Sequence, residues 1–399
     1  MKIIASQFEP ATRKESQDQE ILRKSLTYWQ DAWRRLKNHK LAMVGLIGVI
    51  LILLFAIAGP LFSSFSYSDQ ILDYANVPPR MTIYEVAEDY NVFLTSDYKL
   101  LRVSKKGELL YRIFDSDKDP VNKIYIFSDA DESLDIALDF SYNLLPGKEA
   151  DYDYTFATNG GSEISTPLKT VFNKTYPFGS DGVGRSILVR VMYGARISLT
   201  VAFVASIVNL LIGVVFGSIA AYEGGRTDII MMRFVDILNS IPLLIYIILI
   251  MVLVGNGGLW TMIIALGSVY WVTMARLVRG QVLSLKGQEF VLAARALGVK
   301  RGHIISRHLI PNAIGPILIS MTMMIPQAVF TESFISFIGL GVSAPMASWG
   351  TLANDALGGL FSYPYQLFFP SLAIAVTMLS FNFLGDGLRD ALDPRLRKG

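Results

Sequence analysis

The sequence predicts an all-α polytopic membrane protein with six transmembrane helices and a small β-rich extracytoplasmic domain inserted between helices 1 and 2. Three observations support this fold class. The 399 residues are 52% hydrophobic and only 18% charged, with a mean hydropathy of +0.41, whereas a soluble chain carries more charge. Six apolar stretches are long enough to cross a bilayer. A long polar segment separates the first two of these stretches.

The N-terminal region, residues 1–40, is expected to be cytoplasmic and to end in an amphipathic helix. Its first residues are polar and bear acids, so they do not resemble a signal peptide. Apolar residues then recur at spacings of four and three, which is typical of a helix in the membrane interface, although a helix packed on a soluble partner stays an alternative. These apolar residues are Leu22, Leu26, Trp29, Trp33 and Leu36.

Residues 41–68 are predicted to form transmembrane helix 1. They carry no charge, and nine Lys or Arg residues precede them, which places the N-terminus in the cytoplasm. Residues 69–175 are predicted to form the inserted domain. Within them Tyr98–Ser104 and Leu109–Phe114 flank a Lys-Lys-Gly turn, as in a β-hairpin. Acidic residues outnumber basic ones there, and this surface serves either solubility alone or contact with a substrate-binding protein.

Residues 176–399 are predicted to form the membrane core with helices 2–6. A Gly-x-Asp-x-x-Gly-Arg motif precedes helix 2, and its glycines permit tight turns. Its Asp181 is placed to cap the following helix, so a structural role is favoured over substrate contact. In helix 3, Arg233 and Asp236 are expected to pair. The four motif residues are Gly179, Asp181, Gly184 and Arg185.

Helix 5 carries an acid within an apolar run. Glu332 and its neighbour Ser333 are candidates for the transport pathway or gate, because a buried acid is costly unless it faces water, protein or a ligand. A local cap or pair at the outer end of the helix is the alternative. Trp349, in the following loop, is expected at a membrane interface.

Residues 279–311, called the basic loop below, connect helices 4 and 5. The stretch from Arg276 to Asn312 contains seven Lys or Arg residues and a single acid, Glu289. The sequence predicts a helix from Gln288 that is capped at Gly298, and a second helical segment. A cationic helix–Gly–helix is too polar for lipid, so we expect a cytoplasmic docking loop for a soluble partner.

This loop resembles the EAA loop of bacterial ABC importer permeases. The resemblance rests on Ala293-Ala294-x-x-x-Gly298 and, after nine residues, His308-x-Ile310-Pro311. The family's Glu position holds Leu292, and its later Ile and Leu positions hold His308 and Ile310. Three other segments are similar to peptide-type permeases, although Ser186 stands where these have an acid. They are residues 179–198, residues 331–350 and residues 385–395.

The resemblance implies a type I ABC importer permease of the oligopeptide/dipeptide family, in a bacterial cell membrane with both termini cytoplasmic. It implies a second homologous permease, two ATPase subunits that bind ATP and Mg²⁺, an extracytoplasmic binding protein and a peptide substrate. Nickel chelates or other small solutes stay alternatives as substrates. The residues implied in coupling to the ATPases are Glu289, Ala293, Ala294, Arg295, Gly298 and Pro311.

Several chemistries are not expected of this chain. It has no P-loop motif and no cysteine, and its three histidines are not at metal-ligand spacing. We therefore expect no catalytic residue, cofactor or metal in this chain, and no binding of nucleic acid. An ion-driven secondary transporter would show inverted repeats, which are not apparent. A channel or signalling protein would explain the insert but not the basic loop.

Overall fold

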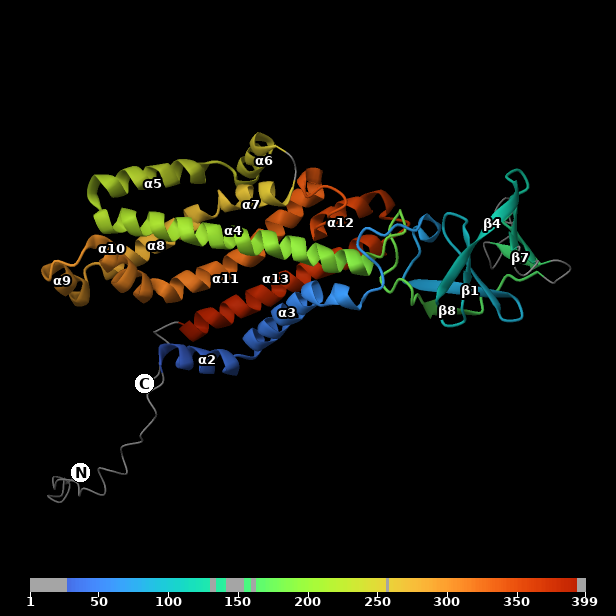
Figure 1. Ribbon diagram of the computed structural model, residues 1–399, viewed down its shortest axis with the longest axis horizontal. Coiled ribbons are helices and arrows are strands. Elements are labelled where there is room, and N and C mark those ends of the chain that lie inside the picture. The colour runs from blue at the N-terminus through green and yellow to red at the C-terminus, as the bar shows by residue number, and fades with distance from the viewer. Residues whose placement is uncertain (1–26, 130–133, 141–153, 159–162, 256–257, 393–399) are drawn as a thin grey trace, which may run out of the picture.

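The computed structural model describes residues 27–129, 134–140, 154–158, 163–255 and 258–392. The protein is elongated, with a bundle of helices at one end and an eight-stranded sheet at the other (Figure 1). Predictions for residues 1–26 and 393–399 lie outside the described residues. They include Leu22 and Leu26, two of the five apolar residues that recur at helical spacing before the first span.

The described part of the bundle has five helices that are long and apolar enough to cross a membrane, or six spans if one bent pair counts as a span. The bent pair therefore decides whether the predicted number of six is reached. The spans are α3 (Lys40–Ile57), α4 (Ile187–Glu223), bent α5 (Gly225–Ser240) with α6 (Leu243–Val254), α7 (Leu259–Gly267) with α8 (Trp271–Leu285), α10 (Arg301–Ile304) with α11 (Ile310–Ile335), and α13 (Tyr365–Leu392).

Two span boundaries differ from those read in the sequence. Helix α3 ends at Ile57, not near residue 68, because Gly59 and Pro60 begin a short 3₁₀ helix. Helix α4 begins at Ile187, ten residues before the uncharged run, and its 37 residues extend about 55 Å at 1.5 Å per residue. A bilayer's hydrocarbon core is about 30 Å thick, so α4 reaches beyond it toward the sheet.

The bent pair α5–α6 turns by 92° around Ile241 and Pro242. Proline supplies no backbone donor, so the helix cannot continue through it unbroken. The predicted pair of Arg233 with Asp236 is wrong. Asp236 instead binds Arg276 of α8 at 2.7 Å, because the helices pack side by side and bring the longer-range partner closer.

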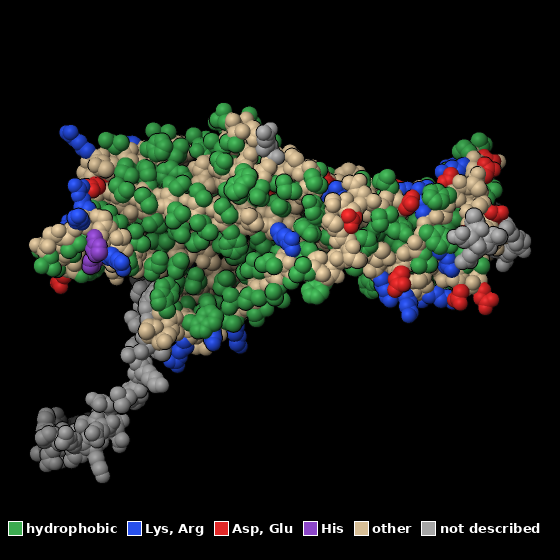
Figure 2. All heavy atoms as spheres, in the orientation of Figure 1, with side chains coloured by type: hydrophobic (Ala, Val, Ile, Leu, Met, Phe, Trp, Pro, Cys, Tyr) green, Lys and Arg blue, Asp and Glu red, His purple; other side chains and the backbone are tan. Residues whose placement is uncertain are grey.

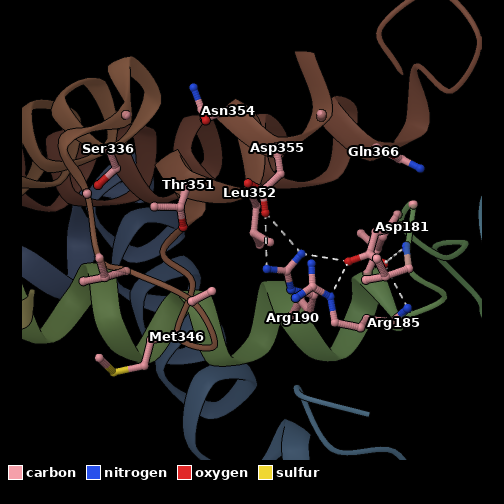
Figure 3. A pocket seen from close by; sticks show the side chains of 18 residues that line it. Asp181, Arg185, Arg190, Ser336, Met346, Thr351, Leu352, Asn354, Asp355 and Gln366 are labelled. Carbon is pink, nitrogen blue, oxygen red and sulfur yellow. Dashed lines mark hydrogen bonds and ion pairs between the residues drawn. The ribbon is translucent and has the colours of Figure 1, made fainter. Parts of the chain in front are cut away.

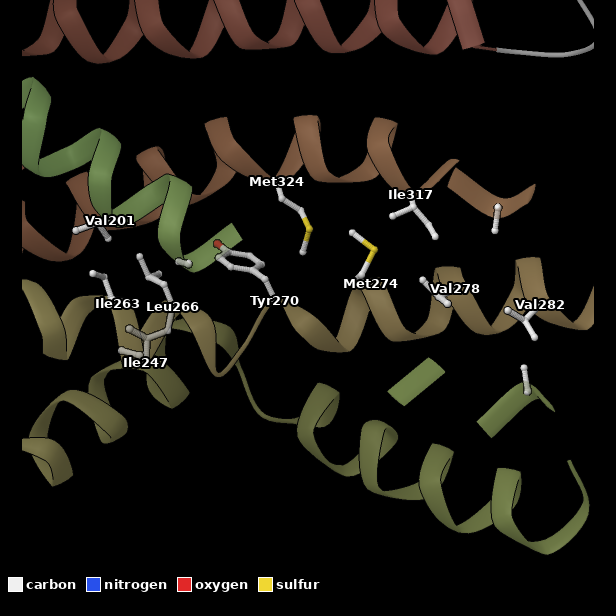
Figure 4. Close-up of a cluster of buried hydrophobic side chains, with 14 of the residues drawn as sticks. Val201, Ile247, Ile263, Leu266, Tyr270, Met274, Val278, Val282, Ile317 and Met324 are labelled. Carbon is white, nitrogen blue, oxygen red and sulfur yellow. The ribbon is translucent and has the colours of Figure 1, made fainter. Parts of the chain in front are cut away.

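Buried apolar side chains from α4, α6, α7, α8 and α11 form one cluster in the middle of the bundle (Figure 4). A second contact joins α3 to α13. There a Cβ on Gly45 would lie 2.6 Å from the backbone of Leu384 and Ser380, so only glycine permits this approach. The outer surface of the bundle is largely hydrophobic, and charges gather toward its ends (Figure 2).

Helix α2 (Tyr28–Asn38) confirms that an amphipathic helix precedes the first span. Thr27 and Gln30 form a capping box at its start. Leu36 is buried near Ala42 and Ala391, whereas the Trp29 and Trp33 side chains are exposed.

The inserted domain is an antiparallel sheet with strand order β7-β6-β5-β4-β3-β2-β1-β8. Its size makes the all-α class wrong, since eight strands and their core form a large second architecture beside the bundle. The predicted hairpin is present as β3 and β4, with Gly107 at positive φ in its turn. The strands are β1 (Arg80–Ala87), β2 (Tyr90–Leu94), β3 (Leu100–Val103), β4 (Leu109–Asp119), β5 (Ile124–Asp129), β6 (Leu134–Asp139), β7 (Thr155–Thr158) and β8 (Lys169–Phe172).

The sheet is buried on both faces near the bundle. Alternate residues of a strand point to opposite faces, and all five residues of β2 are buried. Val92 packs into one apolar cluster, whereas Phe93 packs into another together with Tyr176 of the membrane core. Strand β8 returns beside β1, and Asn173 N–H donates to the Pro79 carbonyl at 2.9 Å. The insert therefore begins and ends at one place.

Candidate functional site

The basic loop lies at the end of the bundle farthest from the sheet (Figure 1). Helix α9 (Glu289–Ala296) has Glu289 in its first turn and Arg295 in its last, which suits the helix dipole. Gly298 follows with φ +78°, and its N–H donates to the Arg295 carbonyl at 3.0 Å. This confirms the predicted glycine cap. A Cβ at Gly298 would meet nothing within 4 Å, so the backbone angle alone selects glycine.

One face of α9 is buried and the other is exposed. Val291 and Ala294 are buried against the bundle, while Ala293 is exposed. Beside it the exposed face presents Leu292 and Leu297, and the Leu297 side chain is 84% exposed. Apolar side chains that remain exposed at the tip of a basic loop indicate a contact surface for another protein.

Cationic side chains join the loop to the turn between α4 and α5. Arg279 makes a bidentate pair with Asp228 at 2.6 and 2.7 Å, and Arg301 binds Glu223 at 2.6 Å. The Arg295 guanidinium stacks on the Tyr222 ring, 4.8 Å from its centroid. These three contacts connect the basic loop to the turn between α4 and α5.

A cavity of about 1240 Å³ adjoins the basic loop. Gln281 of α8, Pro311 of α11 and Arg389 of α13 are among the residues that line it. Pro311 is exposed and starts α11, so it belongs to the cavity wall as well as to the end of the loop.

Glu332 lies inside the bundle with no exposed surface. Its carboxylate accepts hydrogen bonds from Ser198 of α4 and Ser336, both at 2.8 Å, and from Ser333 at 3.3 Å. Ser333 also lines a small apolar cavity. This arrangement supplies the protein surroundings that a buried acid needs. A role of Glu332 and Ser333 in the pathway or gate stays a prediction.

Helix α12 (Trp349–Asp355) packs across α4 and α11. Trp349 was expected at a membrane interface, but its side chain is buried and donates to the Val191 carbonyl at 3.0 Å. The backbone N–H of Trp349 also donates a hydrogen bond to the Ser198 Oγ, at 3.3 Å. The residues around Glu332 therefore join three helices at the sheet end of the bundle.

Asp181 organises the loop before α4. One carboxylate oxygen accepts from the N–H groups of Val183 and Arg185, at 3.0 and 2.9 Å. The other accepts from Arg185 Nε at 2.7 Å and Arg190 Nη1 at 2.8 Å. Asp181 thus holds its own loop, and the predicted capping of the next helix is wrong, since the N-cap of α4 is Ser186.

The two motif glycines have separate reasons to be glycine. Gly184 has φ +77°, and a Cβ there would overlap the backbone of Ile71. Gly179 has φ +82°, and a Cβ would lie 2.5 Å from the Tyr365 ring. Both therefore need glycine for close approach as well as for backbone angle.

A cavity of about 440 Å³ opens beside this motif (Figure 3). Asp181, Arg185 and Arg190 approach it from the α4 side, and Asp355 approaches from α12. Arg190 is the central cation, because it contacts both acids: Asp181 at 2.8 Å and Asp355 at 3.4 Å.

The cavity lies next to the junction between bundle and sheet. Tyr363 donates to Asp97, in the β2–β3 turn, at 2.7 Å. Asn76 donates to the same carboxylate at 3.1 Å and accepts from Gln366 at 3.0 Å. Burial, followed by the hydrogen bond to Asp97, raises the pKa of Tyr363 to about 12.

Sequence reasoning missed Arg190, Asp355 and Tyr363. An Arg near the start of a largely apolar helix is a usable signal, since such a charge needs a partner, and both Arg190 and Arg196 of α4 meet that condition. Asp355 and Tyr363 carried no comparable signal, because their partners lie more than a hundred positions away.

Residues 213–398 match the family described as binding-protein-dependent transport system inner membrane component, and residues 27–79 match the N-terminal transmembrane domain of oligopeptide transport permease C. The chain is 40% identical over 396 residues to the oligopeptide transport system permease protein OppC of Bacillus subtilis, covering 99% of each chain. The chain belongs to the OppC/DppC family of ABC importer permeases.

This permease is therefore an integral membrane subunit of an ABC importer. It is also 38% identical over 379 residues to the dipeptide transport system permease protein DppC of B. subtilis, covering 95% of this chain and 89% of that protein. A chain of the inward-facing MetNI methionine ABC transporter matches with a TM-score of 0.42 and 20% identity, over 51% of this chain and 96% of that chain. The alignment with OppC spans 396 residues, so it includes the insert, beyond the segments in which motifs were recognised.

Proposed function

We propose that this permease forms half of the translocation pathway for oligopeptides or dipeptides in an ATP-driven importer. The names of the B. subtilis relatives support peptide as the substrate. The importer would contain a second homologous permease, two ATPase subunits and an extracytoplasmic binding protein. The ATPases would bind ATP and Mg²⁺, and this chain would contribute no catalytic residue and no cofactor.

The charge distribution supports one orientation. The basic loop and helix α2, which carries Arg34, Arg35 and Lys37, lie toward the same end of the bundle (Figure 1). Lys and Arg favour the cytoplasmic side of a membrane protein. In this orientation both termini are cytoplasmic in a bacterial cell membrane, and the sheet is extracytoplasmic.

The exposed face of α9 is the observation that carries the proposed coupling. Leu292 and Leu297 would insert into a groove of an ATPase subunit, together with the predicted contact residues Glu289, Ala293 and Arg295. When ATP draws the ATPases together, α9 moves with them. The pairs Arg279–Asp228 and Arg301–Glu223 pass this displacement to α4 and α5, and the cavity beside Pro311 would change its opening.

The test uses Leu297→Asp in the complete importer reconstituted in proteoliposomes. An aspartate at this site adds no strain to the loop, because Leu297 is almost fully exposed, but it places a charge in the apolar contact. We expect loss of peptide uptake and of co-purifying ATPase subunits. Ala294→Arg is a poorer probe, since Ala294 is buried and the change would distort the loop itself.

Leu72→Asp, on an exposed leucine at the sheet end, is the matched control and should retain bound ATPases. Normal uptake by the Leu297→Asp variant would disprove docking through α9. Wild-type uptake assays with radiolabelled tri-alanine and with Ni²⁺–histidine, each with the cognate binding protein, test the substrate. Uptake of nickel but not of peptide would overturn the peptide assignment.

A further inference from the structure

We propose that the 440 Å³ cavity at the sheet end is a binding site for short zwitterionic peptides, with Arg190 as partner of the peptide carboxylate and Asp355 as partner of its ammonium group. The proposal rests on the proposed peptide transport and assigns to this chain a peptide contact of its own, separate from any contact in the binding protein.

The cavity has the size and lining of a small-molecule site. Sites of this kind measure about 300–1,000 Å³ and combine apolar walls with a few polar groups. Val342, Met346 and Leu352 contribute apolar wall, and Thr351 and Gln366 contribute polar groups. Side chains of differing size can pack on such walls, whereas the charged groups fix the two ends of a peptide.

The two acids beside the cavity, Asp181 and Asp355, differ in how many hydrogen bonds they form and how closely they contact Arg190. Asp181 uses four hydrogen bonds to hold Arg185, Arg190 and its own loop. Two guanidinium groups thus share one firmly held carboxylate. The second acid, Asp355, is 52% exposed and reaches Arg190 only at 3.4 Å. An incoming carboxylate can therefore replace Asp355 as the second partner of Arg190.

Arg190 is built for this exchange. Its side chain is only 4% exposed, and its Nε has no hydrogen-bond partner among the described residues. The terminal nitrogens Nη1 and Nη2 meet Asp355 only at 3.4 Å, so a ligand carboxylate that approaches them more closely would form a stronger charged hydrogen bond.

Asp355, the α12 acid that contacts Arg190 at 3.4 Å, selects a zwitterion over a bare anion once a ligand carboxylate has displaced it and its half-exposed side chain has turned toward the ligand's ammonium group. An inorganic anion that displaced Asp355 would leave this carboxylate without its partner and close to another negative charge. A peptide supplies an ammonium group for Asp355 at the same time. Both ends of an unblocked peptide are thereby satisfied, and blocking either end removes one of the two pairs.

The experiment measures binding of tri-alanine to the complete importer in nanodiscs without the binding protein, by saturation-transfer NMR and equilibrium dialysis. We expect saturable binding of tri-alanine, and about tenfold weaker binding of N-acetyl-tri-alanine and of tri-alanine amide, because each loses one charged hydrogen-bonded pair. Acetate should not compete at the concentrations that tri-alanine needs.

Asp355→Asn is the decisive variant, since this side chain is half exposed and its loss does not unpack the bundle. It should bind tri-alanine and N-acetyl-tri-alanine about equally. Arg190→Lys keeps the charge but loses the planar fork, and should weaken binding of tri-alanine without affecting the preference for a free amino terminus. Asp117→Asn, on an exposed acid of the sheet, is the control and should match wild type.

Three outcomes overturn the proposal: no saturable binding of tri-alanine, equal competition by acetate, or unchanged discrimination in Asp355→Asn. Failure of the proposed function is separately visible. If peptide-loaded binding protein neither stimulates ATP hydrolysis nor supports uptake in the same wild-type preparation, peptide transport itself is wrong. If the peptide-loaded binding protein stimulates ATP hydrolysis and supports uptake while tri-alanine fails to bind, only the assignment of the cavity is wrong.

Discussion

The two ends of this permease use charge in different ways. At the sheet end, Asp181, Arg185 and Arg190 are largely buried and joined by short hydrogen bonds. At the loop end, Arg279 and Asp228 form one partly buried pair, but the Arg301–Glu223 pair lies at the surface, with the Arg301 side chain 70% exposed. Buried charges depend on their partners, whereas exposed pairs are screened by water. The comparison teaches that the sheet end is fixed by its own charges, while the loop end keeps its surface available for another subunit.

The largest expected effect is that of Asp181→Asn. The amide keeps the shape but removes the carboxylate that, among the described residues, pairs most closely with both Arg185 and Arg190. Breaking a buried pair from one side costs about 3–5 kcal/mol. We expect a large fall in the thermal inactivation temperature of the assembled complex. A fall no greater than that caused by a change at an exposed pair would remove the distinction between the ends.

A second comparison uses two glycines of nearly equal φ. Gly184→Ala should destabilise the complex by more than the roughly 1–2 kcal/mol of a left-handed alanine, because the new Cβ overlaps the Ile71 backbone. Gly298→Ala should destabilise the complex only by the roughly 1–2 kcal/mol of a left-handed alanine, since a Cβ at Gly298 meets nothing within 4 Å. Thermal unfolding of both variants checks this order, and equal losses would show that the sheet end is not tightly packed.

Tyr363→Phe probes the junction through its pH dependence. The pKa of Tyr363 in the folded protein is raised to about 12 from 10.0, so its contribution is complete below pH 10 and is lost as pH rises to about 12. The wild type should therefore lose stability relative to Tyr363→Phe across this window. Protease sensitivity of the insert at pH 9 and pH 11.5 measures it, and parallel curves would contradict the role of the Asp97 contact.

The smallest effect is expected for Glu223→Gln at the loop end. The Arg301 side chain is 70% exposed, and surface pairs contribute about 0–1 kcal/mol. Thermal stability should change little, and the small change should vanish at high salt. A loss comparable to that of Asp181→Asn would mean that the loop is held by its charges as firmly as the sheet end.

Local features of this fold could be predicted from the sequence. The cap at Gly298 and the β3–β4 hairpin follow from backbone preferences within a few residues, whereas the approach of Ile71 to Gly184 does not. Contacts between distant segments could not. Nothing near Asp236 indicates that it meets Arg276, and nothing near Asp355 indicates Arg190. Trp349 was misplaced because a large aromatic suits both an interface and a core, and only packing of α12 on α4 decides between them.

The extent of the sheet was underestimated for a related reason. Alternation is visible in β3 and β4, but β2 (Tyr-Asn-Val-Phe-Leu) is buried on both faces and its sequence shows no alternation of apolar and polar residues. Strand β8 belongs to the sheet only through its pairing with β1, more than eighty positions earlier. Such pairing depends on topology, which one sequence does not display.

The hydrogen bond between Asn173 and Pro79 brings the two ends of the insert together. The insert leaves and rejoins the membrane core at positions that are neighbours in space, although Asp97 and Asn76 also bond to Tyr363 and Gln366. A foreign domain with neighbouring termini could be grafted at this point without lengthening or twisting the membrane helices. Exchange of the sheet at these two chain ends would leave the sequence of the membrane helices unchanged.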